Sequence, residues 1–201
     1  MNVLAPQPQT NLERRLVLIV TGPLASGKTT IGRPLARALA LPFLSKDLFK
    51  ESLFDSLGGS DREWSRRIGL AGTQLLFRCA EALLEAGQSC ALESNFYAQW
   101  DTAPLRNLQI RFGCRFVQVV CSAETAVLVD RFTRRASSGE RHPGHADASA
   151  LAELIPRIVN ERWDALELDG PVIHVDTTSD SADVHQLIRD IRHLIDAHAA
   201  D

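Results

Sequence analysis

One short segment between two hydrophobic stretches constrains the fold of this chain more than any other feature. Residues 22–29 read Gly-Pro-Leu-Ala-Ser-Gly-Lys-Thr, which fits the spacing G-x-x-x-x-G-K-T without deviation. Glycines allow successive backbone N–H groups to turn toward a chain of phosphates, and the N-terminus of a following helix adds a positive dipole. The lysine ammonium and the threonine hydroxyl at the end of the segment suit phosphates and Mg²⁺. The segment therefore predicts a nucleotide-phosphate site between a strand and a helix.

The residue types also assign roles within this loop. Lys28 is expected to reach the phosphates as a catalytic residue, and the Thr29 hydroxyl is expected to bind Mg²⁺. The alternative is a coincidental glycine-rich turn, which would match the four specified positions in roughly one 200-residue chain per hundred. The apolar run Leu16–Val20 before the loop and the helix-like pattern after it favour the phosphate site. We expect nucleotide contacts from Gly22, Pro23, Leu24, Ala25, Ser26, Gly27, Lys28, Thr29 and Thr30.

Short β-like runs alternate with longer helix-like segments along the chain, a pattern typical of a parallel sheet with helices on both faces. The polar, turn-rich residues 136–147 predict a loop within a lid of about residues 133–149. The predicted fold is therefore an α/β sandwich of three layers with a five-stranded parallel sheet and a short lid. The predicted strands are residues 15–21, 42–45, 90–92, 116–120 and 171–175, and the predicted helices begin near residues 31, 48, 61, 123, 151 and 184.

The longest predicted helix, residues 61–87, begins with Asp61 as its N-cap and ends at Gly87. Trp64 and Trp100 are expected to pack in the core, which is the default for aromatic side chains, although either residue could line a pocket for the acceptor. The expected apolar face of this helix is Trp64, Ile68, Ala71, Leu75, Cys79, Ala82 and Ala86.

The length and the net charge of the chain limit the classes of protein to which it can belong. A chain of 201 residues fits one domain, because single hydrophobic cores rarely stop growing below roughly 250 residues. We expect a flexible tail over residues 1–13 and one domain over residues 14–201. A net charge of −3 argues against a general nucleic-acid coat, although a local basic site remains compatible with it.

Other features of the sequence indicate the cellular compartment of the protein. The longest clean aliphatic run, residues 16–20, is far shorter than the roughly 20 residues that a membrane helix needs. The first dozen residues show neither the basic region nor the apolar stretch of a signal peptide. The four cysteines form no CxxC pair and stand in apolar surroundings, which indicates buried thiols. A cytoplasmic enzyme is therefore expected.

Three further segments resemble those of known enzymes: Leu44–Asp55 (LSKDLFKESLFD), Leu92–Phe96 (LESNF) and Asp130–Arg135 (DRFTRR). With the glycine-rich loop, they make residues 16–195 similar to the P-loop kinases, in particular to the small kinases grouped with the AAA-type ATP-binding proteins. Relatives of that group include zeta-toxin-like, chloramphenicol phosphotransferase-like and polynucleotide kinase-like enzymes. The resemblance implies a P-loop NTPase fold, with ATP as the phosphate donor and Mg²⁺ as a cofactor.

Two carboxylates follow predicted strands, at the edge where parallel α/β sheets bind their ligands. In the similar families, the aspartate after the second strand orients the acceptor hydroxyl or takes its proton, a role that carries over to Asp47. The alternative is that Asp47 only caps the next helix. Glu93 stands where those families usually carry aspartate, and it is expected to contact the acceptor, or Mg²⁺ through water. An ion pair with a lid arginine is its alternative. Asn95, on the following loop, is a further candidate for acceptor binding.

Four arginines stand within residues 131–141, beside the polar loop. A lid that neutralises phosphoryl charge would use such a cluster, whereas a solvated helix face is the alternative. Residues 130–135 are similar to the arginine helix of nucleotide monophosphate kinases. That similarity implies that Arg131 stacks on adenine and that Arg135 is a catalytic contact to the transferring phosphate. Arg134 and Arg141 are expected on the substrate side.

The polar loop also carries two histidines, His142 and His145, at the spacing H-x-x-H. A metal site is disfavoured, because Pro143 and Gly144 prevent a helix face and no third ligand is nearby. His142 is instead expected to contact the acceptor. Residues 176–179 are expected either to border the adenine or to cap the last helix.

Together, these features favour a kinase that transfers a phosphate from ATP, bound with Mg²⁺, to a hydroxyl group of a small molecule. The alternative is a nucleotide-binding switch that hydrolyses ATP without such an acceptor. A nucleic-acid acceptor is not favoured, because the sequence has no separate basic tract for a polynucleotide backbone. No membrane partner is expected, and a homodimer is compatible with the sequence.

Overall fold

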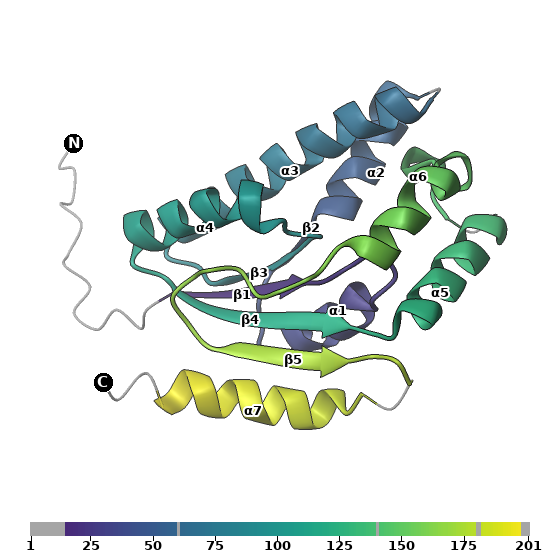
Figure 1. Cartoon of the computed structure of the whole chain (residues 1–201). Coiled ribbons are helices and arrows are strands. Elements are labelled where there is room, and N and C mark those ends of the chain that lie inside the picture. The colour runs from purple at the N-terminus through teal and green to yellow at the C-terminus, as the bar shows by residue number, and fades with distance from the viewer. Residues whose placement is uncertain (1–14, 60, 140, 180–181, 198–201) are drawn as a thin grey trace, which may run out of the picture.

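The computed structural model describes residues 15–59, 61–139, 141–179 and 182–197, so the predicted tail at residues 1–13 lies outside the described part. Five parallel strands form one sheet in the order β2-β3-β1-β4-β5 (Figure 1), which confirms the predicted parallel sheet. The strands are β1 Leu16–Thr21, β2 Phe43–Ser45, β3 Cys90–Glu93, β4 Arg115–Ser122 and β5 Val172–Asp176.

Helices cover both faces of this sheet. Helices α1 and α7 lie on one face, and α3 and α4 lie on the other (Figure 1). The described helical segments are α1 Lys28–Ala38, α2 Lys46–Leu57, α3 Arg62–Glu85, α4 Ala98–Phe112, α5 Thr125–Ser137, the 3₁₀ turn η1 Pro143–His145, α6 Asp147–Asn160 and α7 Val184–Ala197.

The central strand β1 shows why the sheet needs cover on both sides. Its side chains alternate between the two faces, as in any β-strand. Leu18 and Val20 pack with α1 and α7, whereas Val17 and Ile19 pack with α3 and α4. All four side chains are completely buried. A continuous apolar run is typical of a strand buried on both faces, and the predicted three-layer α/β fold is confirmed.

A smaller apolar cluster lies beyond the carboxyl ends of the strands, where α5 and α6 stand side by side (Figure 1). Phe132 of α5 and Leu154 of α6 are buried in it, and Leu24 and Ala25 of the glycine-rich loop pack against it. The helix pair is therefore attached to the glycine-rich loop. Helix α5 extends to Ser137, so the polar loop begins two residues later than the expected residue 136.

The apolar face predicted for the long helix was wrong. Of its expected members, Ile68 is buried, but Leu75 is 38% exposed. The buried face is rotated and includes two glycines, Gly69 and Gly72, which lie against α2. A Cβ atom on Gly72 would lie 3.3 Å from the carbonyl oxygen of Lys46 and from the backbone nitrogen of Lys50. The close approach of the α2 and α3 backbones therefore determines which face of α3 is buried.

Helix α4 was not among the helices predicted from the sequence. Its buried positions, Asp101, Leu105 and Leu108, have helical spacing, but a carboxylate takes the place of the first apolar residue. The Asp101 side chain accepts a hydrogen bond from the backbone N–H of Tyr97, the residue that precedes the helix, at 2.7 Å. Trp100, in the first turn of α4, is 63% exposed, so its expected burial in the core was wrong.

The four cysteines are free thiols. Cys90, Cys114 and Cys121 are buried, as expected, whereas Cys79 is only half-buried. Burial raises the pKa of the Cys90 and Cys121 thiols to about 12, which keeps them protonated and unreactive at neutral pH.

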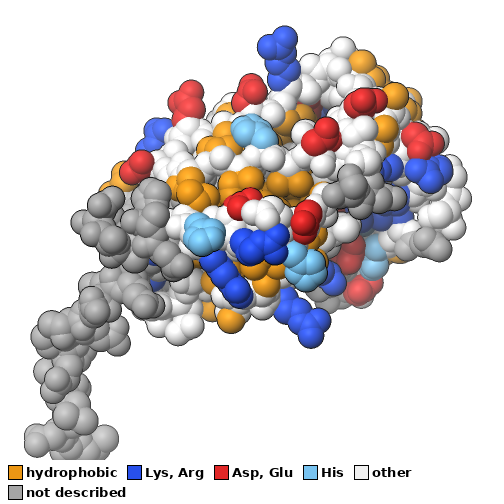
Figure 2. Space-filling model, turned by 90° about the horizontal axis from the view of Figure 1, so that it is seen from below, with side chains coloured by type: hydrophobic (Ala, Val, Ile, Leu, Met, Phe, Trp, Pro, Cys, Tyr) orange, Lys and Arg blue, Asp and Glu red, His pale blue; other side chains and the backbone are white. Residues whose placement is uncertain are grey.

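Charged side chains of both signs are interspersed on the face that carries α7, which Figure 2 shows from below the view of Figure 1. No broad patch of basic side chains covers this view of the described residues, in agreement with the net charge of −3. Within the described ranges, no helix has both the length and the apolar character that crossing a bilayer requires.

Candidate active site

The glycine-rich loop connects β1 to α1 at the carboxyl edge of the sheet, and two of its glycines have positive φ angles. Gly22 has φ +140° and Gly27 has φ +75°, in the region where side chains are strained. A Cβ atom on Gly22 would lie 2.1 Å from the carbonyl oxygen of Cys121 in β4. Glycine is thus required where the loop leaves β1 and passes its neighbouring strand.

Lys28 occupies the interior of this loop. Its side chain is buried, and its Nζ donates a hydrogen bond to the carbonyl oxygen of Pro23 at 2.7 Å. Burial lowers the pKa of Lys28, while the charges of Glu93 and Asp47 oppose that effect. The Ser26 hydroxyl is also buried in the loop, and it has no hydrogen-bond partner among the described residues. An anionic phosphate would satisfy both groups, so the loop fits the triphosphate of a nucleotide.

Glu93, the last residue of β3, joins three segments of the site. It lies beside Val20 of β1 and Ser45 of β2 in the sheet register. Its Oε1 accepts a hydrogen bond from the Thr29 hydroxyl at 3.3 Å, and its Oε2 accepts one from the Ser45 hydroxyl. Burial raises the pKa of Glu93, although these hydrogen bonds and Lys28 oppose the shift. The alternative, an ion pair of Glu93 with a lid arginine, is not what the structure shows.

The Thr29–Glu93 contact is the place where Mg²⁺ would fit. Mg²⁺ usually takes one or two protein oxygens and completes its shell with water and phosphate oxygens. Thr29 and Glu93 supply that small number of oxygen ligands next to the phosphate loop. Over the described ranges of the chain, no group of three or more His, Cys, Asp or Glu side chains forms a separate metal site.

Asp47 lies in the first turn of α2, directly after β2. The N-cap of α2 is Ser45, whose hydroxyl is turned to Glu93, and no side chain caps the helix. The capping alternative for Asp47 is therefore not supported. Instead, Asp47 Oδ2 accepts a hydrogen bond from Arg141 at 2.9 Å. Burial would raise the pKa of Asp47, but electrostatic interactions with His145, Arg141 and Lys28 outweigh it and lower the pKa to about 2.

Two more carboxylates of α2, each four residues after the previous one, bind the polar loop. His145 Nε2 lies 2.8 Å from Glu51 Oε1, and His142 Nε2 lies 3.0 Å from Asp55 Oδ1. Together with the Arg141–Asp47 pair, these contacts attach residues 141–145 to one face of α2. Each histidine is thus turned to a carboxylate of α2. Glu51 and Asp55 were not among the expected site residues, although their spacing from Asp47 places all three on one helix face.

Contacts to the backbone of residues 141–145 also hold this loop against α2 and α3. The Ser65 hydroxyl of α3 donates a hydrogen bond to the Gly144 carbonyl oxygen at 2.8 Å. A Cβ atom on Gly144 would lie 2.9 Å from the Phe54 side chain of α2, so this close contact requires glycine. His142 Nδ1 accepts the Gly144 N–H, which leaves the proton on Nε2, facing Asp55.

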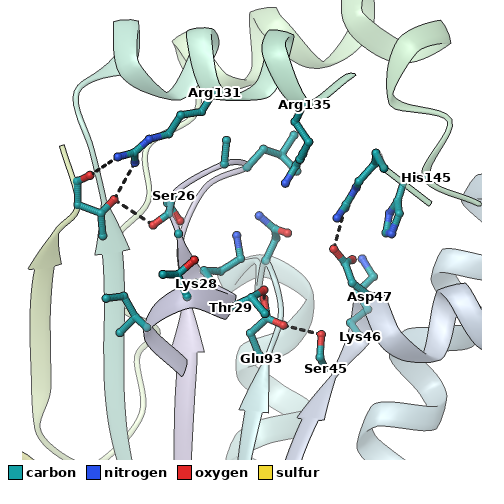
Figure 3. A pocket seen from close by; sticks show the side chains of 18 of the residues that line it. Ser26, Lys28, Thr29, Ser45, Lys46, Asp47, Glu93, Arg131, Arg135 and His145 are labelled. Atoms are coloured by element: carbon teal, nitrogen blue, oxygen red, sulfur yellow. Dashed lines mark hydrogen bonds and ion pairs between the residues drawn. The ribbon is translucent and has the colours of Figure 1, made fainter. Parts of the chain in front are cut away.

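Arg131 and Arg135 reach the site from α5 (Figure 3). Arg131 donates hydrogen bonds to the carbonyl oxygen and the hydroxyl of Thr177, at 2.6 and 3.2 Å. The Thr177 hydroxyl donates in turn to the carbonyl oxygen of Ser26, so Arg131 is tied to the glycine-rich loop. Arg135 extends from α5 toward the space above Lys28 in Figure 3, and its positive charge contributes to the lowered pKa of Lys28.

Residues 176–179 do not cap the last helix. The Asp176 side chain accepts the N–H of Thr178, and the N-terminus of α7 is instead capped by Asp183, which accepts the N–H of Gln186 at 2.9 Å. Thr177 lies beside the glycine-rich loop. That residues 176–179 border the nucleotide base stays a prediction.

These residues surround one cavity of about 900 Å³, at the upper end of the range typical for small-molecule sites. Asn95 also lies at the cavity wall, where its amide donates to the Gly22 carbonyl oxygen at 2.8 Å. Two expected substrate residues lie outside the wall: Arg134, which is exposed and paired with Asp130, and His142. Predicted residues that the structure brings to the wall are Leu24, Ala25, Ser26, Gly27, Lys28, Thr29, Thr30, Asp47, Glu93, Asn95, Arg131, Arg135 and Arg141.

Comparison with known proteins agrees with this architecture. The family described as "AAA domain" matches residues 17–159. A crystal structure of a candidate kinase from Chloroflexus aurantiacus J-10-fl is 39% identical, with 90% of this chain and 98% of that chain covered and a TM-score of 0.79. A sugar kinase from Janibacter sp. HTCC2649 is 23% identical, with 93% and 97% covered and a TM-score of 0.54, which is a likeness of fold alone. No curated protein matches the sequence. The chain belongs to the AAA domain family, and within it to the P-loop kinase group.

Proposed function

We propose that this protein is an ATP-dependent phosphotransferase that moves the γ-phosphate of ATP, bound with Mg²⁺, to a hydroxyl group of a small molecule. One observation carries the proposal: the phosphate-binding loop with Lys28, the carboxylate of Asp47 and the guanidinium of Arg135 face a single cavity. This is the set of groups that phosphoryl transfer requires, because its catalysis is largely positioning and electrostatic stabilisation. The 39% identical candidate kinase supports the same class of reaction.

In the proposed reaction, the bond between the γ-phosphorus and the oxygen that bridges it to the β-phosphate breaks. A new bond forms between that phosphorus and the acceptor oxygen. Lys28 and Arg135 neutralise the charge that spreads over the phosphoryl oxygens. Mg²⁺, when bound beside Thr29 and Glu93, supplies further positive charge to the phosphates. ADP and the phosphorylated acceptor leave.

Asp47 is the candidate partner of the acceptor hydroxyl. Its Oδ2 is bound by Arg141, and its Oδ1 accepts no hydrogen bond from the described residues. With a pKa of about 2, the Asp47 carboxylate is ionised at neutral pH and is a weak base. Its main contribution is therefore to accept a hydrogen bond that orients the hydroxyl. It takes the proton only as the new phosphorus–oxygen bond forms and the hydroxyl becomes acidic.

The direct test is to incubate the protein with ATP, Mg²⁺ and a panel of small alcohols, and to measure ADP release and the mass of any product. We expect ADP release to depend on an acceptor and to match the phosphorylated product in amount. The Lys28→Ala variant is expected to bind ATP more weakly and to transfer no phosphate, with an intact fold. ATP hydrolysis at the same rate with and without every alcohol would overturn the proposal in favour of a hydrolysing switch.

A further inference from the structure

A second hollow, of about 940 Å³, lies between α3 and α4 and adjoins the active site. The two hollows share three residues at their walls: Lys46, Asn95 and Tyr97. These residues come from the start of α2 and from the loop after β3, on the side of the cavity where Asp47 lies. The junction therefore belongs to the acceptor side of the site and not to the nucleotide side.

Lys46 is the cation at this junction. It is the first residue of α2, next to Asp47, and it is half-buried. Its ammonium group makes no hydrogen bond or ion pair with any described residue, and its field reaches Asp101 of α4, whose pKa it lowers against the larger effect of burial. A half-buried ammonium group with no direct partner among the described residues is available to an anionic ligand.

Three arginines on this side already have carboxylate partners. Arg141 is bound to Asp47 at 2.9 Å. Arg62 of α3 is bound to Glu153 at 2.9 Å, and Arg157 of α6 is bound to Glu161 at 2.7 Å. Their charges are therefore largely neutralised within the protein, in contrast to the charge of Lys46.

Tyr97 and Asn95 add polar groups beside Lys46. The Tyr97 hydroxyl accepts a hydrogen bond from Arg157 at 2.6 Å, so its own proton remains available for a ligand. The Asn95 amide nitrogen is used by Gly22, which leaves its carbonyl oxygen as an acceptor. The wall shared by the two hollows thus carries one cation, one hydroxyl donor and one carbonyl acceptor.

We propose that the acceptor of this kinase carries an anionic group, a carboxylate or a phosphate monoester, and that Lys46 binds it while Asp47 receives the hydroxyl. This inference rests on the proposed phosphotransferase function. Because Lys46 and Asp47 both line the active-site cavity from the first turn of α2, we expect a short carbon chain to span the distance between the anion and the reacting hydroxyl. The acceptor class is therefore a hydroxy acid or a phosphorylated polyol of a few carbons, in place of a neutral sugar or alcohol.

The test compares acceptors that differ only in charge: glycerol, glycerate and glycerol 3-phosphate, and the corresponding six-carbon set of sorbitol, gluconate and sorbitol 6-phosphate. Phosphate transfer is measured as kcat/KM. Binding is measured separately by calorimetry, with the nucleotide site saturated by a non-hydrolysable ATP analogue and Mg²⁺. An anionic member of a set is expected to exceed its neutral counterpart by roughly 10- to 100-fold, the scale of one charged hydrogen bond. Whether the carboxylate or the phosphate gains more identifies the anion.

The Lys46→Met variant keeps the length of the side chain and removes its charge. It is expected to lose the preference for anionic acceptors through KM and binding, with ATP affinity unchanged, and Lys46→Arg is expected to retain part of it. Arg189→Met, on the exposed surface of α7, removes the same charge outside the walls of both hollows and is the matched control.

Three results would overturn the inference. The first is equal binding of anionic and neutral members in every set. The second is an unchanged preference in Lys46→Met. The third is an equal loss of ATP affinity in that variant, which would place Lys46 at the nucleotide phosphates. If phosphate is still transferred to some alcohol, these results overturn the inference alone, whereas ATP binding without transfer to any alcohol, neutral or anionic, would overturn the proposed function.

Discussion

Arg141 and Asp47 are 94 residues apart in the sequence, yet the Arg141 guanidinium donates a hydrogen bond to Asp47 Oδ2 at 2.9 Å. This pair connects the segment after α5 to the first turn of α2, directly at the proposed acceptor position. The arginine binds one oxygen of the carboxylate, and the other oxygen accepts no hydrogen bond from the described residues. It also lowers the pKa of Asp47, together with His145 and Lys28, against the effect of burial.

The first prediction concerns this pair. Arg141→Gln is expected to raise the pKa of Asp47 from about 2 toward its ordinary value, because a stabilising positive charge is lost. The acidic limb of the kcat/KM profile against pH should therefore move to higher pH. Arg134→Gln is the control, because Arg134 is exposed and paired with Asp130 on its own helix. Identical acidic limbs for wild type and Arg141→Gln would contradict the prediction.

The same pair contributes to stability with a defined sign. Because the folded-state pKa of Asp47 lies below its ordinary value of 3.8, the unfolded chain binds the proton more readily as the pH falls. The contribution is present above about pH 4 and is lost as the pH falls toward 2. Denaturant unfolding at several acidic pH values is expected to show a smaller decrease in stability for Arg141→Gln than for wild type.

The second prediction is that Asp47→Asn lowers phosphate transfer by about 10²-fold or more, the usual scale of a lost acid–base group. ATP binding is expected to change little, whereas the melting temperature at neutral pH should fall, because Asn cannot keep the ion pair with Arg141. Asp55→Asn is a matched control on the same face of α2, because Asp55 contacts His142 and does not line the cavity. Near-normal transfer by Asp47→Asn would remove Asp47 from the reaction and make Glu93 the next carboxylate to test.

The third prediction separates the two arginines of α5. Arg135→Ala is expected to lower kcat by about 10³-fold with little change in ATP affinity, because its guanidinium acts on charge that develops during transfer. Arg131→Ala should mainly raise the KM for ATP, since Arg131 holds Thr177 beside the glycine-rich loop. Steady-state kinetics with ATP as the varied substrate distinguish the two effects. Normal kinetics in both variants would mean that the cluster is only a solvated face.

The fourth prediction concerns the stability of the loop at residues 141–145. Burial lowers the pKa of His145, although the charge of Asp47 and the hydrogen bond with Glu51 oppose it, while Arg141 and Lys50 add to the lowering. The unfolded chain then binds a proton that the folded protein does not. Stability should therefore be complete above the ordinary histidine pKa of 6.5 and decrease as the pH falls below it.

The measurement is the midpoint of urea unfolding at several pH values on both sides of 6.5. His145→Gln is expected to reduce the decrease on the acidic side, because the buried group that must remain neutral is gone. His193→Gln, on the exposed surface of α7, is the control and should behave like wild type. An equal decrease in wild type and His145→Gln would show that other groups cause the acid sensitivity.

The sequence was most informative where the signal is local. The apolar run of β1 and the glycine-rich loop after it lie within residues 16–29, and their order predicted both the parallel sheet and the phosphate site. It was least informative where two distant segments meet. The face of α3 was predicted wrongly because Gly69 and Gly72 approach the backbone of α2, a requirement for small size that hydrophobic periodicity does not detect.

By itself, the sequence determined the sheet, the position of the phosphate loop and the residue types available for phosphoryl transfer, because strand burial and loop conformation depend on short stretches of chain. Only the tertiary structure decided which of those residues share the cavity. It placed Arg135 at the wall and Arg134 outside it, and it paired Asp47, Glu51 and Asp55 of α2 with a loop some 90 residues away. Such pairings follow from how α2, α5 and α6 pack at the edge of the sheet, and local spacing alone carries no information about that packing.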